Sequence, residues 1–327
     1  MPVMLLRRLL VGLVWVSIFG LSDARLAHAE GRIVVTIKPI HALVAQVMGS
    51  TGSADLLVGG NASPHTYQLK PSDARKIAAA DVIFRVSEAV EPFTGKIAAL
   101  LSKRTELVTL QTAPGIVTLM RREGGPFDSH FHTEAASHST AHDHADDHDD
   151  ANSAIDGHVW LDPANAKVML DEIARVLSKQ TPGLAATYQA NSVSAKARID
   201  QLSSDIERDL APVSGRPYVV FHDAYQYFEK RFKLNVVGSI TVNPDVPPSG
   251  KRLSALRARI MKSRAGCVFG EPNFDAKVIA SIIEGTGARS GVLDPEGTSL
   301  AAGPDLYEQL MRELATNVKA CLARTEP

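Results

Sequence analysis

The chain has 327 residues, of which 45% are hydrophobic and 22% are charged, and its formal net charge is −1. A length of this order predicts about two domains, and the composition is that of a globular protein that can bury a large core. Because positive and negative charges nearly balance, the composition argues against a nucleic-acid-binding protein.

The first 29 residues have the pattern of a secretory signal peptide. Arg7 and Arg8 precede an uncharged apolar run, LLVGLVWVSIFGL, and the segment ends in the tripeptide AHA (27–29). A basic start, a short apolar segment and an A-x-A exit are typical of a cleaved export signal. The apolar run is shorter than the roughly 20 residues that a membrane helix needs. We expect a soluble, exported mature chain that starts near Glu30; an uncleaved anchor is the alternative.

The region from residue 31 to residue 110 alternates between strand-like and helix-like segments. Runs of apolar and β-branched residues predict strands at 31–39, 54–60, 81–87 and 106–110. Apolar residues at helical spacing predict helices at 40–49, 74–80 and 91–103. Ser72 or Asp73 would cap the second of these helices. Such alternation predicts a parallel sheet with helices on its faces.

A polar segment at 127–155 holds more than half of the histidines of the chain. Six of the eleven histidines lie here, diluted by aspartate, serine and alanine: His130, His132, His138, His142, His144 and His148. The segment has too few apolar residues to fold on its own. We expect a disordered loop with several weak zinc sites, which collects zinc for a tighter site elsewhere or senses how abundant zinc is. A solvated spacer that binds metal incidentally is the alternative.

Two long helices are predicted in the middle of the chain, at 162–183 and 184–210. Asp162 can cap the first helix, and Pro163 suits its first turn. The second helix would be about 40 Å long. The alternation then resumes, with predicted strands at 218–221, 234–240, 266–270 and 290–294 and predicted helices at 252–263, 274–287 and 305–323.

These elements together predict an α/β fold. We expect two α/β sandwich lobes with mainly parallel sheets, joined by one long helix. The predicted boundaries are an N-terminal lobe at 30–183, a linking helix at 184–213 and a C-terminal lobe at 214–327.

The folded part of the mature chain keeps four further histidines. We expect His41 to have a structural role near a helix N-terminus. His65 and His222 follow predicted strands, His158 precedes a predicted helix, and Asp294 ends another strand. Ligands of open α/β sheets bind at the carboxyl ends of strands, and three imidazoles with one carboxylate oxygen suit tetrahedral zinc. Each histidine alone could equally be an ordinary packed or exposed side chain.

Three histidines and a water also describe a catalytic zinc site. A hydrolase would need a general base beside the metal, and the sequence has no HExxH helix. We therefore expect a zinc-binding protein and no enzyme.

The chain has only two cysteines, Cys267 and Cys321. In an exported protein two lone cysteines favour a disulfide, which would contribute about 4 kcal/mol in the chain-entropy model. A catalytic thiol is the alternative.

Five stretches carry a family resemblance: ASPHTYQLKPSD (62–73), GHVWLDP (157–163), VVFHDAYQYFEKRF (219–232), CVFGEPNF (267–274) and VLDPEGT (292–298). They resemble the periplasmic zinc-binding proteins of the ZnuA type, which are the substrate-binding subunits of zinc ABC importers. The resemblance covers nearly all of the mature chain. It implies two lobes joined by a rigid helix, with transported Zn²⁺ in the cleft between them. It also implies a monomeric periplasmic protein whose partner is an ABC permease in the inner membrane.

The resemblance implies a ligand set as well. His65, His158 and His222 match the zinc ligands of the family, and His222 favours zinc because a carboxylate takes that place in manganese-binding relatives. The resemblance further implies that Cys267 pairs with Cys321. A zinc chaperone that hands metal to other exported proteins remains an alternative.

The fourth zinc ligand is the point at which this sequence departs from the family pattern. Some members have a glutamate directly before the first histidine, where this chain has Pro64. The fourth ligand is then Asp294 or a water, and we favour Asp294; Glu271 would be a supporting carboxylate. Because Asp294 and His222 both belong to the predicted C-terminal lobe, we expect them to move together when the metal is released.

Overall fold

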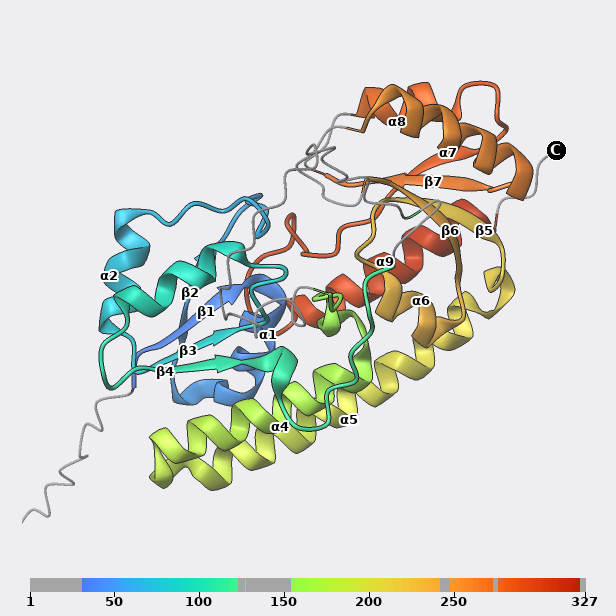
Figure 1. Cartoon of the computed structure of the whole chain (residues 1–327). Coiled ribbons are helices and arrows are strands. Elements are labelled where there is room, and N and C mark those ends of the chain that lie inside the picture. Colours follow the sequence, from blue (N-terminus) through green and yellow to red (C-terminus); the bar gives the residue numbers. More distant parts are fainter. Residues whose placement is uncertain (1–30, 123–126, 128–153, 242–247, 273–275, 324–327) are drawn as a thin grey trace, which may run out of the picture. The chain divides into compact units, whose positions relative to one another are not determined.

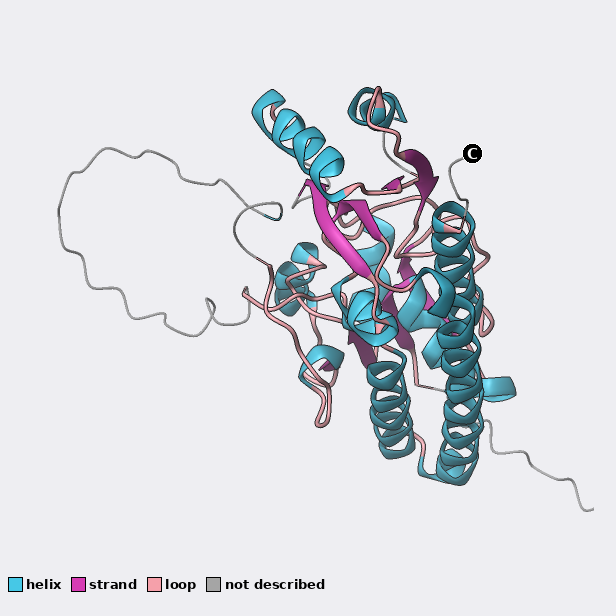
Figure 2. Cartoon of the chain, turned by 90° about the vertical axis from the view of Figure 1, so that its right-hand side faces the viewer, coloured by secondary structure: helices cyan, strands magenta, loops and turns pink. Residues whose placement is uncertain are grey.

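The computed structural model describes residues 31–122, 127, 154–241, 248–272 and 276–323, and residues 31–327 group as one compact unit. Two four-stranded sheets lie in this part of the chain, one before and one after the two longest helices (Figure 1). All strand pairs in both sheets are parallel, as predicted. Figure 2 shows the strands flanked by helices, the layering expected for parallel sheets.

The first sheet is formed by β1 (Ile33–Ile37), β2 (Ala54–Val58), β3 (Val82–Arg85) and β4 (Glu106–Thr109), in the order β2-β1-β3-β4. Every residue of β1 is buried, as expected for an apolar strand in the middle of a covered sheet. Helix α1 (Lys38–Met48) follows β1 directly, and α2 (Pro71–Ala79) follows the loop after β2.

Two details of the N-terminal half differ from prediction. Helix α2 begins at Pro71, so Asp73 lies inside its first turn and accepts a hydrogen bond from the backbone N–H of Lys70 at 2.9 Å. Proline suits the first turn of a helix, which explains the earlier start. The segment Pro92–Leu100 winds as 3-10 turns where an α-helix was predicted. It contains Gly95, and glycine and proline are the residues that least favour an α-helix.

The two sheets are connected by α4 (Pro163–Gln180) and α5 (Ala185–Leu210). The side chain of Asp162 accepts a hydrogen bond from the N–H of Ala164, which confirms the predicted cap. The connection between the helices is short, and α4 and α5 lie side by side (Figure 1). With 26 residues, α5 is about 39 Å long. It contacts α1, α6 and α9 as well as α4, so it packs against helices from both ends of the chain.

The second sheet has the order β6-β5-β7-β8, and its strands are β5 (Pro217–His222), β6 (Asn235–Thr241), β7 (Cys267–Gly270) and β8 (Arg289–Val292). Its helices are α6 (Gln226–Phe232), α7 (Gly250–Ser263), α8 (Ala276–Ile283) and α9 (Leu306–Leu322). Helix α6 was not predicted from the sequence. None of the helices among the described residues is both long and apolar enough to span a membrane.

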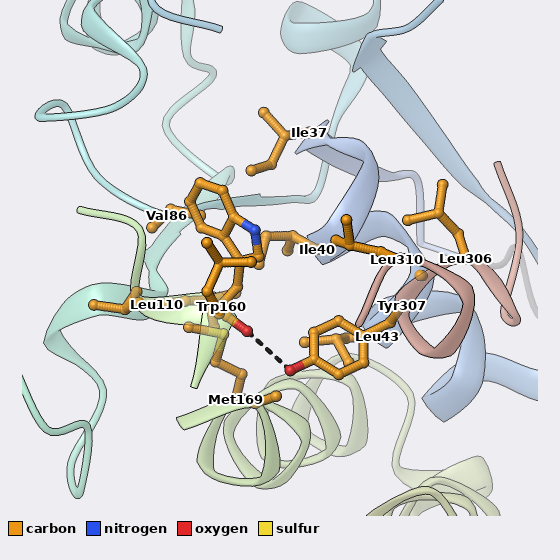
Figure 3. Packing of buried hydrophobic residues seen from close by; sticks show 14 of the residues in the cluster. Ile37, Ile40, Leu43, Val86, Leu110, Trp160, Met169, Leu306, Tyr307 and Leu310 are labelled. Carbon is orange, nitrogen blue, oxygen red and sulfur yellow. Dashed lines mark hydrogen bonds between the residues drawn. The ribbon is translucent and has the colours of Figure 1, made fainter. Parts of the chain in front are cut away.

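One hydrophobic cluster runs from β1 to α9 and includes residues of both sheets. At its centre Trp160 is fully buried, and its backbone carbonyl accepts a hydrogen bond from the hydroxyl of Tyr307 at 2.8 Å (Figure 3). Ile37, Ile40 and Leu43 belong to the same cluster. A second, smaller cluster lies beneath α7 and α8. The main core therefore does not divide along the boundary between the sheets.

Candidate metal centre

Three histidines from distant parts of the chain meet in one place. His65 lies in the loop after β2, His158 immediately precedes the 3-10 turn Val159–Leu161 that leads into α4, and His222 is the last residue of β5. Their ring centroids are 5.4, 5.5 and 5.3 Å apart. One ligand nitrogen from each ring lies within 4.8 Å of the other two, and this is the only such group of potential ligands found in the described part of the chain.

The spacing of the nitrogens suits a single tetrahedral ion. The Nε2 atoms of His158 and His222 are 3.4 Å apart. For zinc–nitrogen bonds of about 2.05 Å, two ligands of a tetrahedron are separated by about 3.3 Å. These two rings therefore already stand at the distance that zinc requires.

Each of two histidines is oriented by a buried carboxylate. Nδ1 of His158 lies 2.8 Å from Oδ1 of Asp156, and Nδ1 of His222 lies 2.6 Å from Oε1 of Glu271. The carboxylate fixes the proton on Nδ1 and leaves the lone pair of Nε2 for a metal, the usual second-sphere arrangement of metal-binding histidines. Glu271 thus contacts His222 as a supporting carboxylate would, and its role toward a metal stays a prediction. The role of Asp156 was missed, although a carboxylate two residues before a candidate ligand was visible in the sequence.

The third histidine, His65, has a ring nitrogen without a hydrogen-bond partner in the described part of the chain. Nε2 of His65 is buried and has no hydrogen-bond partner among the described residues. Burial, followed by the neighbouring His158 and His222 and by Arg121, holds the pKa of His65 well below its usual value of 6.5. An unprotonated imidazole with a buried, unpaired nitrogen is prepared to bind a metal ion.

The pKa of His222 is shifted in the opposite direction from the pKa of His65. Burial by itself would lower the pKa of His222, but the charge and the hydrogen bond of Glu271 outweigh burial and raise that pKa above 6.5. A proton therefore competes with a metal ion more strongly at His222 than at His65.

The pocket beside the histidines is too small for an organic substrate. Its free volume is about 20 Å³, and its lining comprises Ser63, Pro64, His65, His222, Glu271, Pro272, Asp294, Pro295, Glu296 and Thr298. A volume of this size holds about one water molecule or one ion. The site can bind a metal ion with a small additional ligand, and it offers no room for a molecule to be hydrolysed.

Asp294 lines this pocket but lies outside the group of three histidines. Its Oδ1 accepts hydrogen bonds from the N–H groups of Glu296 and Gly297, at 3.0 and 2.9 Å. Its Oδ2 accepts from the N–H and the hydroxyl of Thr298, at 2.6 and 2.7 Å. Each carboxylate oxygen offers about two lone pairs, so both oxygens are fully used by the loop that follows.

Glu296 was missed by the sequence reasoning and lines the same pocket. Its Oε1 is buried and lacks a hydrogen-bond partner among the described residues. Burial, together with the nearby Asp294, Glu91 and Glu271, raises the pKa of Glu296 well above 4.5. Its place two residues after Asp294 is the only signal that the sequence carried.

The remaining candidates are placed as follows. His41 lies in α1, away from the other histidines, with its Nε2 3.1 Å from the carbonyl oxygen of Ala54, which is consistent with a structural role. Cys267 and Cys321 form the predicted disulfide, which ties β7 to α9. The six histidines between 130 and 148 lie outside the described residues.

Comparisons with known proteins point to one family. A family model described as ZnuA, the periplasmic component A of the zinc-uptake complex, matches residues 33–321. The high-affinity zinc uptake system protein ZnuA of Brucella suis biovar 1 (strain 1330) is 42% identical over 319 residues, covering 93% of this chain and 96% of the relative. The protein of the same name from Paracoccus denitrificans (strain Pd 1222) is 38% identical over 307 residues, covering 90% and 93%. A crystal structure of ZnuA superposes with a TM-score of 0.71 at 23% identity and covers 89% of this chain and 98% of its own, a likeness of fold.

Proposed function

This chain belongs to the ZnuA family of periplasmic zinc-uptake components, and from that premise we propose that His65, His158 and His222 bind its zinc ion. The family comprises the substrate-binding components of zinc ABC importers, so the chain is a transport protein that captures zinc for a permease and is no enzyme. The observation that carries the ligand assignment is the convergence of three imidazoles within 4.8 Å. Two of the rings contact carboxylates, and the third has a buried nitrogen for which the described residues offer no hydrogen-bond partner.

The fourth coordination position has two candidates, Asp294 and a water. Ligation by Asp294 would cost at least one of the four hydrogen bonds that its oxygens accept. Each bond to a charged group contributes about 1.5–3 kcal/mol, which the metal bond would have to exceed. A water needs no such rearrangement and fits the pocket volume of about 20 Å³. We therefore propose water as the fourth ligand and keep Asp294 as the alternative.

The histidine-rich segment at 127–155 is proposed to bind additional zinc weakly. The support is compositional, because six histidines fall between positions 130 and 148 among acidic residues. Ordering a polar segment around each ion costs conformational entropy, so its sites would be weaker than the preformed histidine group.

Location, partner and domain boundaries complete the proposal. We propose a mature periplasmic protein that works as a monomer with an inner-membrane permease; the pattern of the first 29 residues and the family support the periplasmic location. We propose lobes at 30–183 and 214–327 with the linking helix between them. The end of α5 at Leu210, followed by the 3-10 turn Ala211–Val213, supports the second boundary.

Zinc titration calorimetry of the metal-free mature protein tests the assignment. His65→Ala and His222→Ala should each remove one tight site and leave weaker binding, whereas deletion of residues 128–152 should remove only the weaker binding. Asp294→Asn should keep one tight site if water is the fourth ligand, weakened only as far as the lost hydrogen bonds of Asp294 loosen its loop. Tight binding that survives both histidine changes would show that the ligands lie elsewhere.

A further inference from the structure

The loop that follows β8 is fastened to the other half of the molecule. Lys38, the first residue of α1, is only 7% exposed. Its ammonium group donates hydrogen bonds to the carbonyl oxygens of Gly297, Thr298 and Leu300, at 3.3, 2.7 and 3.0 Å. An ammonium group has three donors and no acceptor, so these three carbonyls use all of its hydrogen-bonding capacity.

Trp160 provides a second anchor for the same loop. Its indole N–H donates to the carbonyl oxygen of Pro295 at 3.0 Å, and its ring centroid lies 5.3 Å from that of His158. Trp160 is itself fully buried and held by Tyr307 (Figure 3). The loop is thus bound at both ends, by a lysine that follows β1 and by a tryptophan next to a proposed zinc ligand.

Hydrogen bonds within the loop make it one unit. Asp294 bonds the backbone N–H groups of Glu296, Gly297 and Thr298. Four of its residues, from Asp294 to Thr298, line the metal pocket beside His65 and His222. The expectation that Asp294 moves together with His222 stays a prediction, and the bonds from Lys38 and Trp160 of the N-terminal half favour the opposite movement.

We propose that Lys38 is a positioning residue that clamps the 294–300 loop over the metal pocket and thereby sets the rate at which bound zinc leaves. The inference rests on the proposed function of the histidine group. The clamped loop stays with His65 and His158, so the opening that frees zinc would separate this side of the pocket from His222 and Glu271. Loosening the clamp should speed dissociation and leave capture nearly unchanged.

If Lys38 acted only through its charge, its removal would change the zinc affinity in the opposite direction. The ammonium charge lies near the carboxylates of Asp294 and Glu296 and offsets part of their attraction for a cation. If charge alone mattered, removing Lys38 would tighten zinc binding. If the clamp matters, removing Lys38 would weaken zinc binding through a faster off-rate.

The test compares Lys38→Met with Lys76→Met in the mature protein loaded with one zinc. Lys76 also donates to a backbone carbonyl, that of Leu56 at 3.1 Å, but it pairs with Asp55 at the surface and does not line the pocket. Zinc release is followed by stopped flow into an excess of a chromophoric chelator, and association is measured separately. We expect Lys38→Met to release zinc about tenfold faster or more, with an association rate within about twofold of wild type and no change in Lys76→Met.

Hydrogen exchange of the zinc-loaded proteins supplies the second readout. The amides of Gly297 and Thr298, which donate to Asp294, should exchange faster in Lys38→Met. Trp160→Phe removes the indole N–H together with the five-membered ring and should shift both readouts in the same direction, so the proposal stays testable if Lys38→Met does not fold. Unchanged or slower release, or faster release with unchanged exchange of these amides, overturns the clamp. Failure of wild type to bind zinc tightly, or no effect of His222→Ala, would instead overturn the proposed function.

Discussion

Replacing Glu271 tests how the protein tunes His222, the proposed zinc ligand at the end of β5. Oε1 of Glu271 lies 2.6 Å from Nδ1 of His222 and accepts a second hydrogen bond from the hydroxyl of Tyr225 at 3.2 Å. Glu271→Gln keeps an acceptor oxygen but removes the charge, whereas Glu271→Ala leaves two buried donors without a partner. Carboxylates behind metal-bound histidines typically contribute about 10- to 100-fold in affinity. At pH 8 we expect zinc binding to weaken about tenfold in the glutamine variant and about 100-fold in the alanine variant, which is about 1.4 and 2.7 kcal/mol.

The effect of Glu271→Gln on zinc affinity should also change with pH in a defined direction. In wild type, Glu271 outweighs burial and raises the pKa of His222 above 6.5, so protons displace zinc as the pH falls through that raised value. In Glu271→Gln burial remains but the charge is gone, so the pKa of His222 falls. The variant should therefore lose less affinity between pH 8 and pH 6, and the difference from wild type should be largest at pH 8 and shrink toward pH 6.

Competition with a chelator of known zinc affinity, repeated at several pH values, measures both effects. Glu308→Gln is the matched control, because Glu308 forms an exposed hydrogen bond with Arg312 at 3.0 Å, on α9 and outside the pocket lining. An affinity of Glu271→Gln equal to wild type at pH 8 would refute the orienting role. A ratio of affinities that stays constant from pH 8 to pH 6 would refute the link to the protonation of His222.

Three further predictions concern stability. The Cys267–Cys321 disulfide spans 54 residues, so Cys267→Ser with Cys321→Ser should lower the free energy of unfolding by about 4 kcal/mol, measured by urea denaturation; a loss below about 1 kcal/mol would contradict this. The guanidinium of Arg122 bonds the buried carboxylates of Asp223 and Glu229, so Arg122→Met should cost about 3–5 kcal/mol in the same assay, and a neutral change would contradict the pairing. Burial raises the pKa of Glu91 from 4.5 to about 7, so its stabilisation is full below pH 4.5 and is lost as the pH rises through 7, by at most about 3 kcal/mol. Glu91→Gln should flatten the fall in stability between pH 5 and pH 8, and an unchanged slope would count against a raised pKa.

Most of the fold could be predicted because its signals are local. The buried strands are short apolar runs bounded by turns, and α4 carries its own cap at Asp162. Helix α6 was missed since it has only 7 residues, four of them buried, and tertiary contacts such as the bond from the hydroxyl of Tyr227 to the carbonyl of Asp156 help to fix its place. The 3-10 turns at Pro92–Leu100 were taken for an α-helix because apolar spacing does not distinguish the two.

The convergence of the three histidines could be predicted only where the candidate residues lie at strand ends. His222 ends β5, and parallel strands bring their carboxyl ends to one edge of the sheet, where ligands bind. The strand end also made Asp294 a candidate ligand, but the sequence could not show that its oxygens accept four hydrogen bonds from the loop that follows. Lys38 and Gly297 are 259 residues apart in the sequence, and a contact over that distance leaves no local pattern.

The hydrophobic cluster shared by the two sheets has a consequence for cooperativity. Because the same side-chain packing joins β1, α5, β5 and α9, neither sheet can lose its core while the other keeps its own. Heating should therefore melt both sheets in one calorimetric transition, although the architecture would suggest two. The smaller cluster beneath α7 and α8, with Leu256, Ile260 and Ile279, is a separate packing unit. That layer can open as an independent foldon and should exchange its amide protons well before the shared core does.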